Sequence, residues 1–305
     1  MKKKALIAMS GGVDSSVAAF LMQQQGFDCG GAIMKLWEEN SPAAISDAQA
    51  VADRLGMDFH VLDATSPFRR EVVDYFIESY EAGLTPNPCI RCNRHLKFSY
   101  FLSCLSQRQL AHSRFPLGSL TKEQAREIAR EQGFINARKK DSQDICFVPD
   151  GDYVAFMKRY TGKEYASGDY LDLNGKVVGS HCGAVCYTLG QRKGLGIALG
   201  APVYVCSKDM QANTVTVGPE SALFATTLLA DNWSWFPFDT LTAPIRVMAK
   251  ARYRHIPQPA TVYPMENGAA KVVFDTPQRA MTPGQTVALY DGDMVIGGGI
   301  ITDIL

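Results

Sequence analysis

One turn near the start of the chain gathers two glycines, three serines and an aspartate. It is the stretch AMSGGVDSS at residues 8–16, which follows a short apolar run and precedes the helical pattern VAAFLMQQQG. Backbone N–H groups at the start of a helix, beside a flexible glycine-rich turn, form an anion-binding hollow, and serine hydroxyls add donors. Phosphate suits such a turn, and Asp14 would help to hold Mg²⁺ there. The alternative is an ordinary strand-to-helix turn in which Ser10 or Ser15 caps the helix.

Cysteines form the second group of residues with chemical potential. Cys89 and Cys92 stand three apart in TPNPCIRCNRHLKF, and Cys146 stands in KKDSQDICFVPDGDY, just after basic residues. Basic neighbours and a helix start after Pro88 predict a lowered thiol pKa, which would make a thiolate available near neutral pH. We expect thiols, ligands or catalysts rather than structural bridges, because the cytosol keeps disulfides reduced.

The elements that must position these residues alternate between strand and helix in the first half of the chain. We expect strands at residues 5–9, 31–36 and 59–62, and helices at 13–25, 43–55 and 67–82. That alternation predicts a parallel sheet with helical crossovers. The AMSGGVDSS turn then lies beyond the carboxyl ends of the strands, where such sheets bind ligands. A later helix should begin after the cap residue Thr121 and end at Gly133.

From about residue 162 the pattern changes to short strands separated by glycine and proline. Asn174-Gly175 and Asp291-Gly292 are hairpin signals between alternating runs. We therefore predict an α/β fold class: a Rossmann-like parallel-sheet domain at 1–161, a small central β domain at 162–222 and a C-terminal β-barrel at 223–305.

The charge balance and the apolar runs narrow the partners. The chain has 305 residues with 31 basic and 31 acidic side chains, so a nucleic-acid partner needs a local basic face. The apolar run at the N-terminus is too short for a signal peptide, and no run approaches the roughly 20 residues of a membrane span. We expect a cytoplasmic monomer that does not bind membranes.

Several motifs, in order along residues 5–302, carry a resemblance to a known family. They are AMSGGVDSS, MKLW, TPNPCIRCNRHLKF, KKDSQDICFVPDGDY, YTLGQRKGLGI, ARYRHIP and MTPGQTVALYDGDMVIGGGII. The chain resembles the tRNA-specific 2-thiouridylases, members of the ATP pyrophosphatase (PP-loop) family. The resemblance implies that ATP and Mg²⁺ adenylate the C2 carbonyl oxygen of the tRNA wobble uridine, and that sulfur from a donor protein then replaces that oxygen.

The resemblance also implies site residues. Cys92 would be the nucleophile and Cys146 the carrier of a persulfide sulfur, with a Cys92–Cys146 disulfide reset by an external thiol. The implied nucleotide-binding residues are Ala8, Met9, Ser10, Gly11, Gly12, Val13, Asp14, Ser15 and Met34. The implied tRNA-binding residues are Asn87, Pro88 and Cys89 against the target base, together with Arg252, Tyr253 and Gln285.

One departure from the family pattern opens an alternative. Where many members carry an acidic residue, this chain has Cys89. Cys89, Cys92 and Cys146 could ligate three irons of a [4Fe–4S] cluster and leave the fourth iron open to bind sulfide. A zinc site that adds Cys182 and Cys186 is a further alternative, although C-x₃-C is an unusual half-site.

Three basic segments offer RNA contacts. In AKARYRHIP, strand alternation would place Lys250, Arg252 and Arg254 on one face about 6.7 Å apart, a spacing that can follow phosphates. The segment at residues 138–140 would steer RNA toward Cys146, and the GQRKGLG loop is either a phosphate contact or a plain turn. For each segment, a solvated surface is the alternative.

A second departure concerns length. The family continues after CNRHLKF through another strand, a Gly-His-Tyr segment and an Asp-Gln pair, whereas here Phe98 is followed directly by Ser99. Loss of that strand would expose a sheet edge, so we expect residues missing from the sequence and a break between Phe98 and Ser99. The competing functions are an amide-forming synthetase of the same superfamily and an RNA-binding protein with a vestigial nucleotide site.

Overall fold

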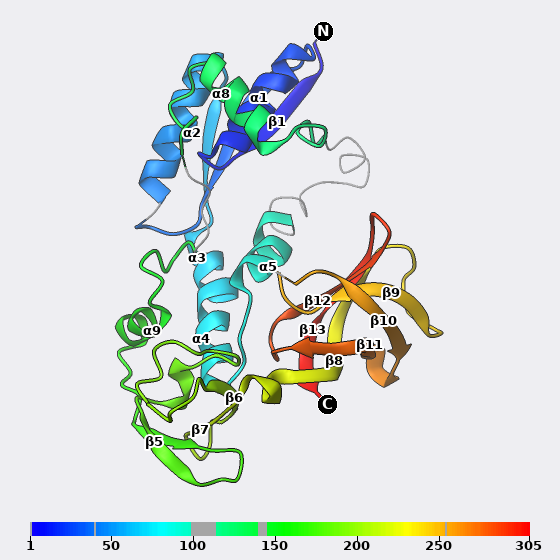
Figure 1. The fold of residues 1–305 in the computed structure, drawn as a ribbon. Coiled ribbons are helices and arrows are strands. Elements are labelled where there is room, and N and C mark those ends of the chain that lie inside the picture. Colours follow the sequence, from blue (N-terminus) through cyan, green and yellow to red (C-terminus); the bar gives the residue numbers. More distant parts are fainter. Residues whose placement is uncertain (1, 40, 99–113, 140–144, 254) are drawn as a thin grey trace. The chain divides into compact units, whose positions relative to one another are not determined.

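The computed structural model describes residues 2–39, 41–98, 114–139, 145–253 and 255–305. The chain divides into two compact units (Figure 1). The first comprises Met1–Asp74 and Pro88–Tyr153, and the second comprises Tyr75–Asn87 and Val154–Leu305. No helix in the described ranges is long and apolar enough to cross a lipid bilayer.

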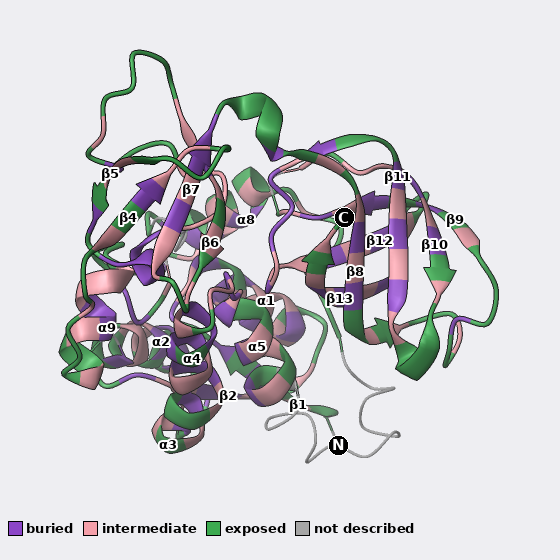
Figure 2. Ribbon diagram, turned by 90° about the horizontal axis from the view of Figure 1, so that it is seen from below, coloured by how far each residue is buried: buried purple, intermediate pink, exposed green. Residues whose placement is uncertain are grey.

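The first unit is built on a parallel sheet of strand order β1-β2-β3. Its strands are β1 (Lys4–Met9), β2 (Asp28–Lys35) and β3 (Phe59–Asp63), and its longer helices are α1 (Val13–Gln24), α2 (Ser41–Leu55) and α8 (Lys122–Glu131). The three helices bury one face of the sheet in a single apolar core that includes Ile7, Val17 and Val51 (Figure 2). The predicted alternation and parallel sheet are confirmed.

β1 lies at an edge of this sheet, pairing with β2 alone among the described residues. Its side chains alternate as the pleat requires: Ile7 and Met9 are buried, whereas Leu6 on the opposite face is 63% exposed. Within the described residues, no further strand pairs with the open side of β1. The expected break between Phe98 and Ser99 lies outside the described residues.

The helical stretch predicted at 67–82 is interrupted. It consists of α3 (Thr65–Phe68), a π-helix (Arg69–Asp74) and α4 (Tyr75–Glu81), and the boundary between the two units falls where α4 begins. A second such pair follows, α5 (Pro88–Cys92) and a π-helix (Asn93–Phe98). π-Turns concentrate at functional sites, and here one directly follows Cys92.

α8 begins as its sequence predicts. The Thr121 hydroxyl accepts from the Gln124 backbone N–H at 3.3 Å, while the Gln124 side chain accepts from the Thr121 backbone N–H at 2.8 Å. This reciprocal capping box satisfies two otherwise unpaired donors. The helix ends before Gly133, whose φ of +64° suits glycine.

The second unit contains the helix α9 (Tyr153–Thr161) and a sheet of order β5-β4-β7-β6. The strands are β4 (Gly168–Leu171), β5 (Val177–His181), β6 (Tyr204–Asp209) and β7 (Thr214–Gly218), with 3-10 turns at Ala184–Cys186 and Glu220–Leu223. The predicted Asn174-Gly175 hairpin joins β4 and β5, and Gly175 has φ +81°.

A closed barrel of order β10-β11-β8-β13-β12-β9 completes this unit, as predicted. Its strands are β8 (Phe224–Trp235), β9 (Ile245–Lys250), β10 (Gln258–Pro264), β11 (Ala270–Arg279), β12 (Thr286–Asp291) and β13 (Met294–Ile304), with a 3-10 turn at Glu266–Gly268. Gly297 and Gly299 make room for Trp235 and Trp233, whose rings stack 4.6 Å apart.

Gly299→Ala should destabilise the barrel. The added Cβ would lie 2.7 Å from the Trp233 ring and 3.0 Å from the Asp231 carbonyl oxygen. Overpacking of this kind costs about 1–3 kcal/mol, so the melting temperature should fall by about 3–10 °C. Gly30→Ala is the matched strand control, because its Cβ would meet only the Asp58 carbonyl oxygen at 3.8 Å. Equal melting of the two variants in calorimetry would contradict the packing argument.

Candidate functional site

The turn between β1 and α1 has a backbone that only glycine fits. Gly11 has φ +68°, and a Cβ at this position would lie 2.4 Å from the Ala44 carbonyl oxygen on α2. Gly12 is the N-cap of α1. The first helix of the sheet therefore starts from a turn pressed against the second helix, with its amide groups at the carboxyl edge of the strands.

The serines of this turn bind one another and the loop backbone. The Ser15 hydroxyl accepts from the Ser10 N–H at 3.1 Å and lies 3.1 Å from the Gly12 carbonyl oxygen, to which it donates. The Ser16 hydroxyl also donates to the Gly12 carbonyl, at 3.0 Å. Within the described chain, no side chain caps α1 at Gly12. This geometry favours the anion-binding interpretation over the alternative in which Ser10 or Ser15 is the helix cap.

Asn136 and Lys139, from the turn after α8, bind the backbone of the turn between β1 and α1. Both donate to the Gly11 carbonyl oxygen at 3.2 Å, and the Asn136 amide also donates to the Ser16 hydroxyl at 2.9 Å. Lys139 pairs in addition with Asp47 on α2, at 2.6 Å. Asn136 is only 3% exposed, and its Oδ1 has no partner among the described atoms. Sequence reasoning missed Asn136.

One residue of the basic segment before Cys146 makes contacts that the sequence did not predict. Lys139 was predicted to steer RNA, but its ammonium group contacts the phosphate-loop backbone and Asp47. Arg138 is exposed, and Lys140 lies outside the described residues. The signal that could have revealed this contact is the position of the segment after a helix that packs on α1.

Asp14 stands in the first turn of α1 and pairs with Lys122. The Lys122 ammonium nitrogen lies 2.8 Å from Asp14 Oδ1, and Lys122 is the first residue of α8. Asp14 is the carboxylate in this loop that is suited to Mg²⁺, a cation that prefers oxygen ligands. The residues present thus fit a magnesium–phosphate group.

The other predicted nucleotide-binding residues divide between core and surface. Met9 and Val13 are buried in the apolar core of the first unit, so only their backbone groups remain for a ligand. Ala8 is exposed near the end of β1, and Met34 is half-buried near the end of β2. Both alternate with core-facing neighbours and so share the sheet face that carries Leu6.

The predicted nucleophile, Cys92, is the last residue of α5 and is 5% exposed. Burial is the main cause that raises the pKa of the Cys92 thiol to about 11; the Lys97 charge acts to lower it, and the charges of Cys146 and Cys89 act to raise it. The sequence-based prediction of a lowered pKa is therefore wrong. Cys92 ends its short helix instead of starting it, so the positive helix terminus does not act on the thiol.

Two basic neighbours of Cys92, Arg91 and His95, are engaged elsewhere or uncharged. The Arg91 guanidinium donates to the Glu71 carbonyl oxygen at 3.0 Å and pairs with the Glu71 carboxylate at 3.5 Å. The pKa of His95 is lowered by burial and by Arg91, so the imidazole is neutral at pH 7. Their charges do not stabilise a Cys92 thiolate.

Cys146 belongs to the same electrostatic neighbourhood. The residue is exposed, but surrounding protein atoms raise the pKa of its thiol, the charge of Cys89 raises it further, and Lys97 lowers it. The next residue, Phe147, is 1% exposed and packs its ring 6.1 Å from Trp37 and 5.8 Å from Phe68. This aromatic cluster fixes the segment that carries Cys146, and the structure brings Cys89, Cys92 and Cys146 within electrostatic reach of one another.

The metal alternatives gain no support from this geometry. In the described parts of the chain, no three His, Cys, Asp or Glu side chains are arranged to hold a metal ion. The iron–sulfur alternative stays a hypothesis. The zinc alternative would combine cysteines that belong to two different units.

Of the residues predicted to touch the target base, Pro88 is buried at the start of α5 and Cys89 is exposed beside it. Asn87 is half-buried and ends the segment that belongs to the second unit. The assignment of these three residues to the target base stays a prediction.

The basic stripe predicted in AKARYRHIP does not form as a strand face. β9 ends at Lys250, and Arg254 lies outside the described residues. Arg252 turns inward, donating to the Leu189 carbonyl at 3.0 Å and to the Thr282 hydroxyl at 2.6 Å, and burial lowers its pKa. Tyr253 is 87% exposed, with the Lys250 ammonium 5.8 Å from its ring. Tyr253 thus presents an aromatic face to solvent.

Gln285 has a structural contact within the second unit. Its amide donates to the Thr85 carbonyl oxygen at 2.7 Å, and the Thr85 N–H donates to the Pro283 carbonyl at 2.9 Å. Gly284 allows this approach, since a Cβ there would lie 2.9 Å from the Thr85 nitrogen. The TPGQ turn of the barrel thereby holds the chain segment that leads to Pro88.

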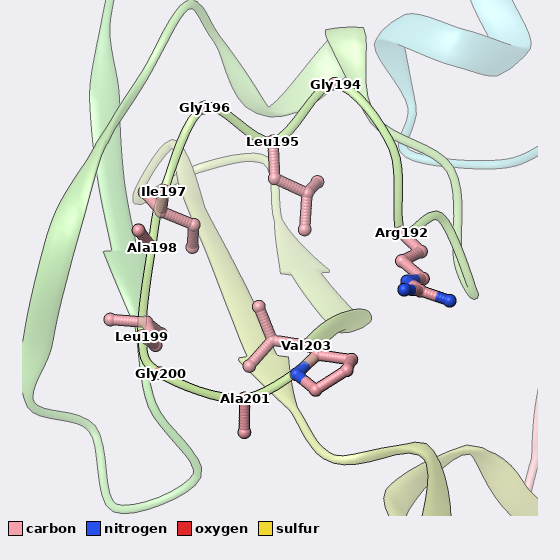
Figure 3. Close-up of a pocket in the computed structure, with 11 residues that line it drawn as sticks. Arg192, Gly194, Leu195, Gly196, Ile197, Ala198, Leu199, Gly200, Ala201 and Val203 are labelled. Carbon is pink, nitrogen blue, oxygen red and sulfur yellow. The ribbon is translucent and has the colours of Figure 1, made fainter.

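The GQRKGLG loop surrounds a hollow of about 380 Å³ lined by Arg192 and residues 194–203. Figure 3 shows Leu195, Ile197 and Val203 pointing into this hollow, with Arg192 at its margin. Gly194 and Gly196 have φ of +77° and +70°. The Gln191 side-chain oxygen accepts from the Thr188 N–H, and its amide N–H donates to the Lys193 carbonyl, which closes the turn. The loop is thus a glycine-dependent turn with one cation beside an apolar hollow.

Family profiles match nearly the whole chain. The tRNA methyl transferase HUP domain matches residues 3–99 and 98–150, the tRNA methyl transferase PRC-barrel domain matches 154–219, and the aminomethyltransferase beta-barrel domain matches 225–301. The HUP profile is split where residues 98 and 99 meet, the position at which the family motifs predict a missing stretch.

Two relatives illustrate the similarity. The tRNA-specific 2-thiouridylase MnmA of Clostridioides difficile (strain 630) is 41% identical over 355 residues, covering 99% of this chain and 98% of that protein. The tRNA-specific 2-thiouridylase MnmA of Acetivibrio thermocellus is also 41% identical, covering 98% of this chain and 99% of its own. Both alignments are longer than this 305-residue chain, so the relatives contain residues that it lacks. The chain belongs to the tRNA-specific 2-thiouridylase family.

Proposed function

We propose that this protein is an ATP-dependent tRNA sulfurtransferase that converts the wobble uridine to 2-thiouridine. The observation that carries the proposal is the combination, in one compact unit, of an uncapped glycine-serine turn at the start of α1 with the three cysteines Cys89, Cys92 and Cys146. The names of the relatives support the same reaction.

The first step activates a poor electrophile. The C2 oxygen of uridine attacks the α-phosphate of ATP, and pyrophosphate leaves. The amide groups at the start of α1 and the Lys139 ammonium, 3.2 Å from the Gly11 carbonyl, supply the positive field that stabilises the departing charge. Bound Mg²⁺, held at Asp14, would add further neutralisation of the phosphates.

The second step transfers sulfur. A donor protein leaves a persulfide on Cys146, and its terminal sulfur attacks C2 as AMP departs. The Cys92 thiolate then attacks the Cys146 sulfur of the S–S bond, which forms a Cys92–Cys146 disulfide and leaves sulfur on the base. An external thiol reduces the disulfide to restore both thiols. Lys97, whose charge lowers the pKa of both thiols, is the group that favours the reactive thiolates.

The competing function is an RNA-binding protein with a vestigial nucleotide site. The turn retains its left-handed Gly11, its bonded serines and two nearby lysines, Lys122 and Lys139. A vestigial site would have no constraint to keep these contacts. The retained contacts of the turn therefore favour an enzyme that uses a nucleotide. The three cysteines favour a sulfurtransferase over an amide-forming synthetase of the same superfamily.

Cys92→Ala should abolish 2-thiouridine formation while leaving tRNA affinity within about twofold, because the thiol acts in chemistry and not in docking. The assay follows thiolated tRNA together with AMP and pyrophosphate, with ATP, a persulfide donor and tRNA present. Cys146→Ala should behave in the same way. Cys206→Ala, on β6 of the second unit, is the control and should retain activity. Loss of tRNA binding in Cys92→Ala would instead indicate a structural thiol, and ATP turnover that never depends on tRNA would contradict the function.

Alkylation of Cys92 should depend steeply on pH. Because the pKa of this thiol is raised to about 11, the thiolate is scarce at pH 7 and the iodoacetamide rate should rise about tenfold per pH unit up to pH 10. Lys97→Gln should move the profile to higher pH, since the Lys97 charge lowers that pKa. Mass spectrometry of the Cys92 peptide measures the rate. A profile that levels off below pH 8.5 would contradict the burial argument.

A further inference from the structure

Cys89 and Cys92 form a C-x-x-C pair on a single turn of helix. α5 spans Pro88–Cys92, and the two cysteines lie three residues apart on it. Cα atoms three apart in an α-helix are about 5 Å from each other, which lies within the range of about 4.4–6.8 Å that a disulfide bridges. A small adjustment of the helix turn therefore suffices to join the two thiols.

The two thiols of this pair differ in their access to solvent. Cys89 is exposed, whereas Cys92 is only 5% exposed. An exposed thiol with a buried partner one helical turn later is the arrangement of dithiols that exchange with external disulfides and thiols. The turn itself is anchored, because the Arg91 guanidinium between the two cysteines donates to the Glu71 carbonyl oxygen at 3.0 Å. The pair is thus a held feature of the unit, with one member open to other molecules.

The third thiol of the neighbourhood is Cys146. The charge of Cys89 acts to raise the pKa of both Cys92 and Cys146, so Cys89 lies close enough to influence each of them. In the proposed reaction, one turnover leaves a disulfide between Cys92 and Cys146, with the Cys89 thiol beside it. A thiol held in the same molecule acts at an effective concentration of about 1 mM or more. Cys89 is therefore placed to attack that disulfide before an external thiol does.

We propose that Cys89 is the resolving cysteine of the sulfur-transfer cycle. The Cys89 thiol gives its proton to solvent, and its thiolate attacks the Cys92 sulfur of the Cys92–Cys146 disulfide. The Cys89–Cys92 bond forms as the Cys92–Cys146 bond breaks, and Cys146 leaves as a thiolate that takes up a proton, so this exchange needs no oxidant or reductant. An external dithiol then attacks the exposed Cys89 sulfur, supplies two electrons and leaves as its own disulfide. The inference rests on the proposed function, since that reaction generates the first disulfide.

The exchange separates the two halves of the cycle. Cys146 regains its thiol as soon as Cys89 has reacted, and is ready for the next persulfide while the oxidised pair still awaits the external dithiol. The acidic residue that many members of the family carry at position 89 has no such chemistry. The step therefore belongs to chains that have the C-x-x-C pair.

Disulfide mapping of the full chain tests the exchange in the absence of tRNA. The reduced protein, prepared without oxygen, is oxidised with one equivalent of diamide, left to equilibrate, alkylated and digested with trypsin. Basic residues between the three cysteines place them on separate tryptic peptides. The Cys89–Cys92 bond should be about fivefold more abundant than the Cys92–Cys146 bond, because thiol exchange moves the disulfide to the helical pair. In Cys89→Ser the bond should instead join Cys92 and Cys146.

Turnover measurements test the role of Cys89 in the cycle. With tRNA, ATP, a persulfide donor and a limiting dithiol, the rate of the first turnover is compared with the steady-state rate. Cys89→Ser should lower the ratio of steady-state to first-turnover rate about tenfold, because the internal thiol is lost, and excess dithiol should restore it. Cys89→Asp should behave in the same way, and melting curves of both variants exclude a folding defect. Cys182→Ser is the matched control, an exposed cysteine of the second unit, and should match the wild type in both experiments.

Three outcomes would overturn the inference, and they differ from failure of the function. A predominant Cys92–Cys146 bond in the oxidised wild type would show that Cys89 does not resolve it. Equal rate ratios in the wild type and Cys89→Ser would show that the cycle does not use Cys89. Iron and sulfide bound by the wild type but lost in Cys89→Ser would make the thiols cluster ligands. If the wild type thiolates no tRNA, the proposed function fails, while the mapping still decides whether the helical pair forms.

Discussion

The close approach of Gly11 to Ala44 is the constraint on which the proposed nucleotide site depends. A Cβ at Gly11 would lie 2.4 Å from a backbone oxygen of α2, so the loop can only be pressed against that helix without a side chain. This contact turns the Gly11 carbonyl toward the Asn136 amide and the Lys139 ammonium, both at 3.2 Å. One backbone position thereby links β1, α1, α2 and the turn after α8, and gives the free amides of α1 their direction.

The sulfur site depends on the balance between burial and charge. Cys92 is almost fully buried, and the resulting loss of hydration outweighs the nearby Lys97, so the thiol stays protonated near neutral pH. A protonated, buried thiol is protected from oxidants and stray electrophiles, which react with the thiolate. Cys146 is exposed, as the proposed transfer from a donor protein requires, while its neighbour Phe147 is anchored among Trp37 and Phe68. Cys146 is thus the exposed thiol of the pair, and Cys92 is the buried one.

Local patterns predicted most of the fold. The strand and helix alternation, the Thr121 cap and the two hairpins follow from short-range rules, and the structure confirms them. The interruption of the 65–81 helical stretch was missed, because a π-helix leaves no mark in hydrophobic periodicity. The glycine-serine turn was placed correctly between β1 and α1, because its residue types and the apolar run before it are visible in the sequence, and its binding of phosphate stays a prediction.

The errors concern contacts between distant segments. The pKa of Cys92 was predicted with the wrong sign, since sequence neighbours such as Arg91 bind Glu71 and burial cannot be read from spacing. Arg252 was placed on an exposed stripe, but β9 ends before it and its guanidinium turns to Leu189 and Thr282. Asn136 and Lys122 carry no local signature, and only the packing of α8 on α1 brings them to the loop.

The edge position of β1 has a consequence for the handling of this protein. A strand that lacks a neighbour on one side presents a row of backbone donors and acceptors, and the KALIAM sequence adds the exposed Leu6 to it. Such an edge can recruit an extended segment from another molecule by main-chain pairing. Where this edge stays open, as it is within the described residues, such pairing would favour self-association through the first strand, and a charged residue in place of Leu6 would oppose it.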